Sequence, residues 1–388
     1  MTREKGDRFI FRAREVSALL ILVAAGFGCA GATVYAPPAS AKSRAPYEAP
    51  PAAKHAIAIE IDTAAAAQIL AFLSRPQFRV DEAKALEDLP AVKLTLRDSS
   101  RTADVFERDL AAAFEAEPKS AVFDFHSIRA AQSRWEGLLS ALPARKADLA
   151  RMAAERAAAL LPADRAVSTH LQVFLTFGVA GLADHLVVAM PDGSEAMIVD
   201  LARALGDAAG ESVDDQVERV ARLIAGEAFR QSWRTYRAGN PNWARHDPAL
   251  GQLEPLFQII TELGPAALFH VDENFFPLSV WLKEPMKRTI AELNRTAERL
   301  VESESELEQR MTLSAEIRRL DFGQRIAGPG GAFLSDGIIQ NLGLDAFRTA
   351  LAGGPKAFFL AYDRAQQKSR DLIPLSDVIR SRLAKTTP

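Results

Sequence analysis

The segment that decides how the chain is interpreted is Val217–Trp233, with the sequence VERVARLIAGEAFRQSW. Its apolar residues recur every three or four positions, which predicts an amphipathic helix. Near the centre of this helix stand Gly226 and Glu227. A glycine in a helix interior costs about 1 kcal/mol relative to alanine, and a carboxylate on an apolar face must find a partner or lose its charge. Helix formation alone therefore does not explain these two residues.

The position of Glu227 on the helix favours a partly buried carboxylate. At about 100° per residue, Glu227 falls between Val220 and Leu223, on the flank of the apolar stripe. Arg230 follows three residues later, so the two side chains can form an ion pair along the helix. The alternative is that Glu227 lies at the edge of the stripe and reaches water. The acidic pair at 214–215 predicts the start of the helix, because negative charge suits its N-terminal end.

Length and composition are those of an ordinary globular protein. The chain has 388 residues, of which 48% are hydrophobic and 25% charged, and a formal net charge of -3. This length allows one large domain or two ordinary ones. No basic surplus indicates nucleic acid and no acidic tail indicates a charged partner. We therefore expect no nucleic-acid partner.

The first 41 residues have the pattern of a secretory signal peptide. A basic start precedes a short apolar run, and Ala39 and Ala41 form a cleavage pattern that predicts processing after Ala41. A retained membrane anchor is one alternative. Lipid attachment at Cys29 is another, which Gly26 disfavours. Cys29 is the only cysteine, so the mature chain would hold no disulfide and no thiolate site. We expect a periplasmic or secreted protein of bacterial type, with no stable membrane span after cleavage.

The pattern along the chain predicts an α+β, mostly helical fold. A small mixed sheet is expected to pack on the helix at 217–233. Prolines 90, 118, 143 and 162 punctuate the helical segments that precede this sheet. The predicted divisions are a signal peptide at 1–41, a flexible linker at 42–54, an N-terminal mostly helical region at 55–165, a domain at 166–375 and a C-terminal tail at 376–388.

Three shorter patterns after residue 166 predict individual elements. Residues 167–178, VSTHLQVFLTFG, alternate as in a half-buried strand, and 184–190, DHLVVAM, form a second strand. Asp192-Gly193 then predicts a hairpin-type turn. Further on, we expect one long charged helix over 284–320, and a turn before a helix at 328–333, GPGGAF.

The order of these elements resembles that of bacterial zinc-dependent peptidases of the gluzincin type. The likeness covers most of residues 56–370 and implies a zincin-like domain. The segments that carry it are IAIEIDTAAAAQILAFL at 57–73, the strands at 167–178, 184–190 and 195–205, the helix at 217–233, IITELGPAALF at 259–269 and the glycine-rich segment that begins at 328. The helix at 217–233 stands where those enzymes carry the motif HExxH.

In the intact motif, two histidines four residues apart bind zinc and the glutamate between them activates the metal-bound water. The resemblance puts Gly226 and Arg230 in the two histidine positions and keeps Glu227 as the remnant of the general base. Glu262 would be the third ligand, although ELGPA is one residue longer than the usual spacing. Glycine offers no ligand, and arginine is always protonated and repels a divalent cation. No two of the six histidines lie four residues apart.

We therefore expect Arg230 to replace the metal by neutralising Glu227 and Glu262. The hypothesis is an exported zinc-peptidase-like protein that has lost metal and catalysis, needs no cofactor, and binds a peptide or protein partner in the former cleft. One alternative is an active peptidase that holds zinc through unconventional ligands. Another is a helical secreted interaction module unrelated to zincins, which predicts no mixed sheet beside the helix at 217–233.

Overall fold

The computed structural model describes residues 55–115, 122–178, 184–206, 212–244, 246–271, 280–303, 307–319 and 322–385. The predicted signal peptide, Cys29 and the predicted linker lie outside these ranges. Among the helices that are described, none has both the length and the apolar character needed to cross a membrane.

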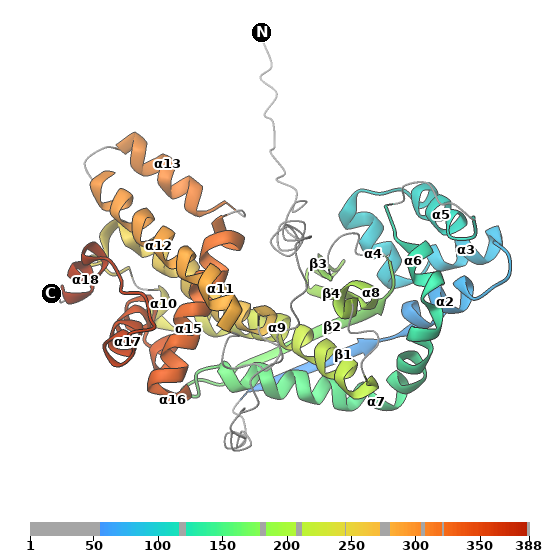
Figure 1. The fold of residues 1–388 in the computed structure, drawn as a ribbon, viewed down its shortest axis with the longest axis horizontal. Coiled ribbons are helices and arrows are strands. Elements are labelled where there is room, and N and C mark those ends of the chain that lie inside the picture. The colour runs from blue at the N-terminus through green and yellow to red at the C-terminus, as the bar shows by residue number, and fades with distance from the viewer. Residues whose placement is uncertain are drawn as a thin grey trace, which may run out of the picture. The chain divides into compact units, whose positions relative to one another are not determined.

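The fold contains a four-stranded mixed sheet with the strand order β1-β2-β4-β3 (Figure 1). β2 pairs in parallel with β1 on one side and with β4 on the other, while β3 runs antiparallel to β4 at the edge. The strands are β1 (Ala56–Asp62), β2 (Ser168–Thr176), β3 (His185–Ala189) and β4 (Glu195–Asp200). The fold class predicted from the sequence, α+β and mostly helical with a small mixed sheet, is confirmed.

The hairpin between β3 and β4 and the burial of β2 follow from local sequence and position. Gly193 has φ +85°, a left-handed conformation that glycine adopts without steric cost, so the predicted turn at 192–193 is confirmed. The predicted alternation of β2 holds only in its first half, because Val173–Thr176 are buried on both faces. β2 has a strand on each side, and a central strand covered on both faces loses its polar positions.

The helices before β2 end in one long helix. The elements in this part are α2 (Ala64–Leu73), α3 (Val80–Glu87), α4 (Pro90–Ser99), α5 (Ala103–Ala112), α6 (Phe125–Ala130) and α7 (Gln132–Leu160). The prediction that Pro143 ends a helix is wrong, because α7 continues through it. Its packing along α9 and β1 offsets the one backbone hydrogen bond that proline removes.

The helix predicted at 217–233 is α9 (Val213–Gly239), which follows the short α8 (Leu201–Leu205). The Ser212 hydroxyl accepts a hydrogen bond from the Asp215 amide, which confirms the predicted start. The end is later than predicted, because the segment 234–239 continues the helix. α9 packs against α7, α11 and β2, so every residue from Val220 to Phe229 is buried. A helical module without a sheet therefore does not describe this fold.

The helices after α9 surround α11 and α15. They are α10 (Pro241–Ala244), the 3₁₀ helix η2 (Gly251–Leu253), α11 (Glu254–Val271), α12 (Val280–Glu302), α13 (Leu307–Ile317), the π-helix η4 (Gly323–Ala327), α15 (Gly328–Leu342), α16 (Leu344–Ala352), α17 (Pro355–Lys368) and α18 (Asp377–Ala384). The segment predicted as a turn, 328–333, instead forms the first turns of α15. Its glycines let two helices approach closely, since a Cβ on Gly264 of α11 would lie 2.3 Å from the Gly331 Cα.

Two more segments differ from their sequence patterns. The single helix expected over 284–320 is two helices, α12 and α13, and the Ser303 hydroxyl donates to the Leu300 carbonyl where α12 ends. Such a local bond competes with helix continuation. The predicted tail contains α18, which contacts α12 and α17. The sheet also spans the predicted division between 165 and 166, because β1 pairs with β2 along its whole length.

Candidate functional site

Glu227 is buried in α9, with only 3% of its side chain exposed, and both of its carboxylate oxygens are bound. Arg230 donates from Nε to Oε2 at 2.7 Å and from Nη2 to Oε1 at 2.6 Å. Gln231 donates a third hydrogen bond to Oε1 at 3.1 Å. The ion pair that the three-residue spacing predicts is therefore present, and it uses the two-point geometry that makes arginine–carboxylate pairs strong.

A second carboxylate completes this arrangement from the sheet. Glu195 is the first residue of β4, and its Oε2 accepts from Arg230 Nη2 at 2.8 Å. Arg234, one turn further along α9, donates from Nη1 to both oxygens of Glu195 at 3.1 Å. We call Glu195, Glu227, Arg230 and Arg234 the α9–β4 ionic cluster. Its two carboxylates and two guanidinium groups balance in formal charge, and it ties the helix to the β3–β4 hairpin.

The electrostatics of the cluster favour the charged forms of Arg230 and Glu195. Burial acts to lower the pKa of Arg230, but the hydrogen bonds and charges of Glu227 and Glu195 raise the pKa above its usual value. Burial acts to raise the pKa of Glu195, but Arg230 and Arg234 bring it below its usual value. Arg230 and Gln231 together fill both lone-pair sites of Glu227 Oε1, and Arg230 takes one of the two on Oε2. The arrangement is that of a structural ion-pair network.

Glu262 lies apart from this cluster. Its Oε2 forms an ion pair with Arg237 Nη1 at 2.7 Å, so the expectation that Arg230 neutralises Glu262 is not met. The physical reason is the register of α11 on α9, in which Trp233 Nε1 donates to the Thr261 carbonyl at 3.2 Å. That contact places Glu262 beside the last turns of α9, two turns beyond Arg230.

The residues that the resemblance puts in metal-ligand positions do not fit zinc. Gly226 is buried in α9 and offers no donor, and Arg230 brings a positive charge onto both oxygens of Glu227. Within the described ranges, no group of three or more histidine, cysteine, aspartate or glutamate residues is arranged to hold a metal ion. Arg230 places a positive charge directly on the Glu227 carboxylate.

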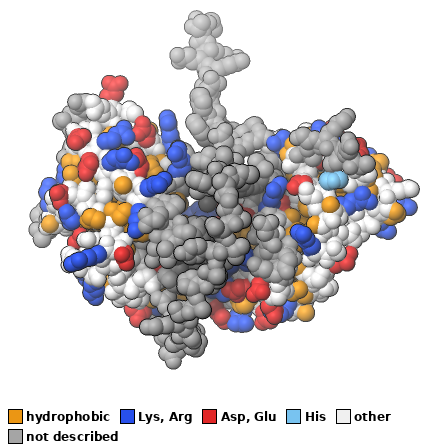
Figure 2. All heavy atoms as spheres, in the orientation of Figure 1, with side chains coloured by type: hydrophobic (Ala, Val, Ile, Leu, Met, Phe, Trp, Pro, Cys, Tyr) orange, Lys and Arg blue, Asp and Glu red, His pale blue; other side chains and the backbone are white. Residues whose placement is uncertain are grey.

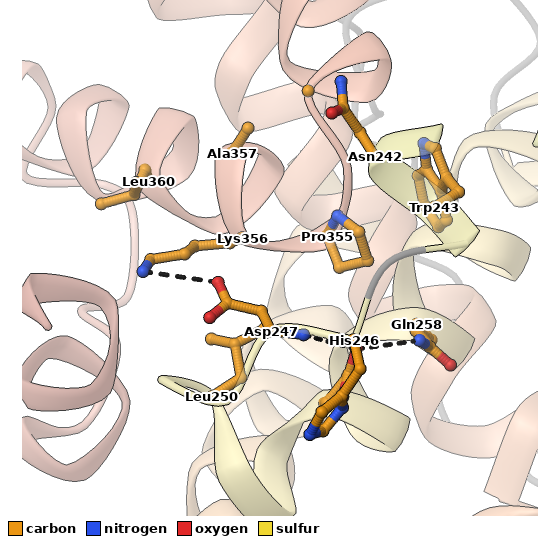
Figure 3. Close-up of a pocket in the computed structure, with 12 residues that line it drawn as sticks. Asn242, Trp243, His246, Asp247, Leu250, Gln258, Pro355, Lys356, Ala357 and Leu360 are labelled. Carbon is orange, nitrogen blue, oxygen red and sulfur yellow. Dashed lines mark hydrogen bonds and ion pairs between the residues drawn. The ribbon is translucent and has the colours of Figure 1, made fainter. Parts of the chain in front are cut away.

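A separate cavity lies beyond the C-terminal end of α9 (Figure 3). It has a volume of about 460 Å³ and is lined by Asn242, Trp243, His246, Asp247, Leu250, Glu254, Gln258, Gly353, Pro355, Lys356, Ala357 and Leu360. Trp243 connects it to α9, because its ring packs edge-on against Trp233 with centroids 5.0 Å apart. The Arg237 guanidinium lies 5.2 Å from the centroid of the Trp243 ring, so Arg237 links Glu262 to this side of the helix.

The polar groups of the cavity are already paired. Lys356 Nζ lies 3.5 Å from Asp247 Oδ2, and Figure 3 shows the two side chains directed toward one another. His246 Nδ1 contacts the buried carboxylate of Glu254. The volume is in the range of small-molecule sites, but the lining holds no serine, threonine or cysteine that could act as a nucleophile. No local sequence pattern indicates this cavity, because it forms where α17 meets α10 and the start of α11, and α17 is distant from both in sequence.

Comparison of the chain with protein-family models, with curated proteins and with solved structures finds no match. The functional interpretation therefore rests on the geometry of the α9–β4 ionic cluster and of the sheet beside it.

Proposed function

We propose that this chain is a zinc-peptidase-like protein that has lost metal and catalysis and that binds a peptide or protein partner in the former cleft beside α9. The observation that carries the proposal is the two-point ion pair between Arg230 and Glu227. In a working HExxH site, the glutamate activates a metal-bound water. Here Arg230 takes the second histidine position and holds that glutamate, so the pair argues against catalysis. The hydrogen bond from Arg230 to Glu195 of β4 is the contact that ties α9 to the sheet.

The edge of the sheet supplies the binding surface in this proposal. β3 pairs with β4 in a register that joins residue 184 to 200 and residue 190 to 194 through backbone hydrogen bonds. In an antiparallel pair, the backbone N–H and C=O groups of successive residues alternately bond to the neighbouring strand and point away from it. The backbone groups of Val187 and Ala189 are therefore directed away from β4. An extended peptide can add to such an edge as a further strand.

Two contacts define how much of this edge a partner can use. Arg97, from α4, donates to the Ala189 carbonyl and so occupies that end of the strand. At the same end of the hairpin, Glu195 is held by Arg230 and Arg234. The hairpin is thus fixed on α9 before any partner arrives, which lowers the ordering cost of binding. The segment around Val187 is where we place the first backbone contact.

The loss of metal is tested by metal analysis of the purified chain and by a peptidase assay on unfolded casein. We expect zinc well below one ion per chain and no hydrolysis. Stoichiometric zinc that disappears in Glu227→Ala would overturn the proposal. The resemblance has a test of its own, because Gly226→His/Arg230→His rebuilds the family motif. This double variant is expected to take up zinc, whereas Arg230→His alone is not.

Partner binding is tested with a phage-displayed random peptide library selected on the immobilised chain. Val187→Pro removes the outward N–H without touching the hydrogen bonds to β4, and Val187→Thr keeps that N–H as the matched control. We expect selected peptides to bind the parent chain and Val187→Thr and to lose binding to Val187→Pro. Peptides that bind all three equally would show that the β3 edge is not the site.

A further inference from the structure

The cavity beyond the C-terminal end of α9 contains a carboxylate that is nearly buried. We call this cavity, of about 460 Å³, the α10–α17 cavity. Glu254 lines it from the first position of α11, and only 10% of its side chain is exposed. The described groups that contact its oxygens are the His246 ring, the Asp247 backbone nitrogen at 3.3 Å and Gln258 Nε2 at 3.4 Å. Only the histidine among these can carry a positive charge, and its side chain is 69% exposed.

Burial makes the Glu254 carboxylate a favourable position for a further positive charge. The buried carboxylate of Glu227 is held at two points by the permanent cation of Arg230. At Glu254, the two neutral donors lie at the long end of the hydrogen-bond range. The N-terminal end of α11 adds a partial charge of only about +0.5. A buried carboxylate needs a cation and hydrogen bonds to offset its lost hydration, so a cation that enters the cavity would improve the pairing of Glu254.

The lysine that lines the cavity is held by other groups. Lys356 Nζ donates to the Lys385 carbonyl at 2.6 Å and lies 3.5 Å from Asp247 Oδ2. Figure 3 shows the Lys356 side chain directed toward Asp247. Within the described part of the chain, no ion pair joins Lys356 to Glu254. The Lys356 ammonium group therefore does not supply the cation that the buried carboxylate favours.

The rest of the lining suits the apolar part of a small molecule. Its apolar side chains are those of Trp243, Leu250, Pro355, Ala357 and Leu360. Leu360 is 38% exposed although it is a large apolar residue. Small-molecule sites are concave and mostly apolar, with a few polar groups that orient the ligand, and the volume of this cavity lies in their range. A ligand with one charged group and an apolar body fits such a lining.

We propose that the α10–α17 cavity binds a small organic cation, with an ammonium group at Glu254 and an apolar body against Trp243 and Leu360. An ammonium group carries three N–H donors, and its bonds to a carboxylate are stronger than those of neutral donors. The exposed His246 ring turns toward solvent to admit this group. A metal ion fits less well, because within the described ranges no three acidic, histidine or cysteine side chains are grouped to hold one. This ligand is distinct from a peptide at the β3 edge, so the proposal does not rest on the proposed function.

The test is isothermal titration of the full chain with phenethylamine, with 2-phenylethanol, which has a hydroxyl in place of the ammonium group, as the comparison. Glu254→Gln removes the carboxylate charge at nearly constant shape. The matched control Glu155→Gln removes the same charge from α7, where the side chain is 62% exposed. Basic and acidic side chains are interspersed over the surface in Figure 2, so one distant charge should change binding little. We expect saturable one-to-one binding by the parent chain and the control, and affinity lowered roughly tenfold or more in Glu254→Gln.

A second pair of variants leaves the buried carboxylate intact. Leu360→Glu and Leu360→Lys place opposite charges at an exposed position of the lining, so they should strengthen and weaken phenethylamine binding, respectively, and leave 2-phenylethanol unaffected. Far-UV circular dichroism shows whether each variant keeps the parent fold, and this pair decides the matter if Glu254→Gln does not fold.

Four outcomes would overturn the proposal. The first is the absence of saturable phenethylamine binding by the parent chain, and the second is equal affinity for 2-phenylethanol. The third is an equal loss of affinity in Glu254→Gln and Glu155→Gln. The fourth is tighter binding of 3-phenylpropionate than of phenethylamine, which would assign the cavity to an anion.

Discussion

Arg230 and Glu227 form a two-point ion pair within one helix, with Nε–Oε2 and Nη2–Oε1 distances of 2.7 and 2.6 Å. Pairs at this spacing on a solvated helix contribute only a few tenths of a kcal/mol. This pair differs because 3% of the Glu227 side chain and 28% of the Arg230 side chain are exposed. Breaking a buried pair leaves a charge without a partner in a weakly solvating environment. Arg230 is therefore important because its removal would leave the Glu227 carboxylate buried without a cation beside it.

Removal of Arg230 is therefore expected to destabilise the fold far more than removal of its neighbour Arg234. Arg230→Ala leaves Glu227 buried and unpaired, at a cost of about 3–5 kcal/mol. Arg234 is 51% exposed and contacts only Glu195 within the cluster, so Arg234→Ala should cost at most about 1 kcal/mol. Urea unfolding of the two variants measures the difference. Equal losses of unfolding free energy in the two variants would mean that the ion pair with Glu227 stabilises the fold no more than the exposed pair does.

The cluster also predicts acid sensitivity through Glu195. Its pKa in the folded chain lies below the usual value of 4.5, since Arg230 and Arg234 outweigh the effect of burial. A lowered pKa contributes stability that is fully present above the unfolded-state pKa and is lost as the pH falls through the folded-state pKa. Glu195→Gln should thus be less stable than the parent chain at pH 6, and the two should converge toward pH 3, in urea unfolding across that range.

A control separates this effect from general acid unfolding. Glu115 is exposed and lies outside the cluster, so Glu115→Gln should follow the parent chain at every pH. If Glu195→Gln keeps the same stability deficit at pH 3 as at pH 6, the contribution of Glu195 does not come from its charge.

The features that the sequence predicted correctly are those set by residues near one another in the chain. The start of α9 follows from the acidic pair at 214–215, the hairpin turn from Asp192-Gly193, and the Glu227–Arg230 pair from a spacing of three. Each depends on a local rule of backbone or side-chain geometry. The mixed sheet could be predicted because its strands show alternating or continuous apolar residues.

The features that the sequence did not predict depend on contacts between distant segments. Glu195 is 35 residues from Arg230, and no spacing rule connects the start of a strand to the middle of a later helix. The partner of Glu262 is set by how α11 lies on α9, which is a packing outcome. Helix continuation through Pro143 likewise depends on neighbours that a local reading of proline leaves out.

Asn240, the residue after the end of α9, is expected to stabilise the contact between α9 and α16. This buried side chain donates from Nδ2 to the Tyr236 hydroxyl at 2.8 Å and to the Ala352 carbonyl at 3.1 Å, so it joins the helix to the end of α16. Asn240→Ala leaves these buried groups with fewer partners, at a cost of about 1–3 kcal/mol. Asn242 is exposed and also donates to the Ala352 carbonyl, at 3.0 Å. Asn242→Ala is the matched control and should cost clearly less in thermal or urea unfolding.

The crossing of α11 and α15 gives the sharpest steric prediction. A Cβ on Gly264 would lie 2.3 Å from the Gly331 Cα and 2.4 Å from its carbonyl carbon, both backbone atoms that cannot rotate away. Gly264→Ala should therefore push the two helices apart and cost at least about 1–3 kcal/mol, as overpacking does. Gly137 is also inside a helix, but the nearest atom to its Cβ would be Val213 Cγ2 at 3.9 Å. Gly137→Ala should stabilise the chain by up to about 1 kcal/mol, because alanine is the better helix former. Opposite signs of the two changes in urea unfolding would identify backbone contact as the reason for glycine at 264, whereas a gain in both would contradict the close crossing.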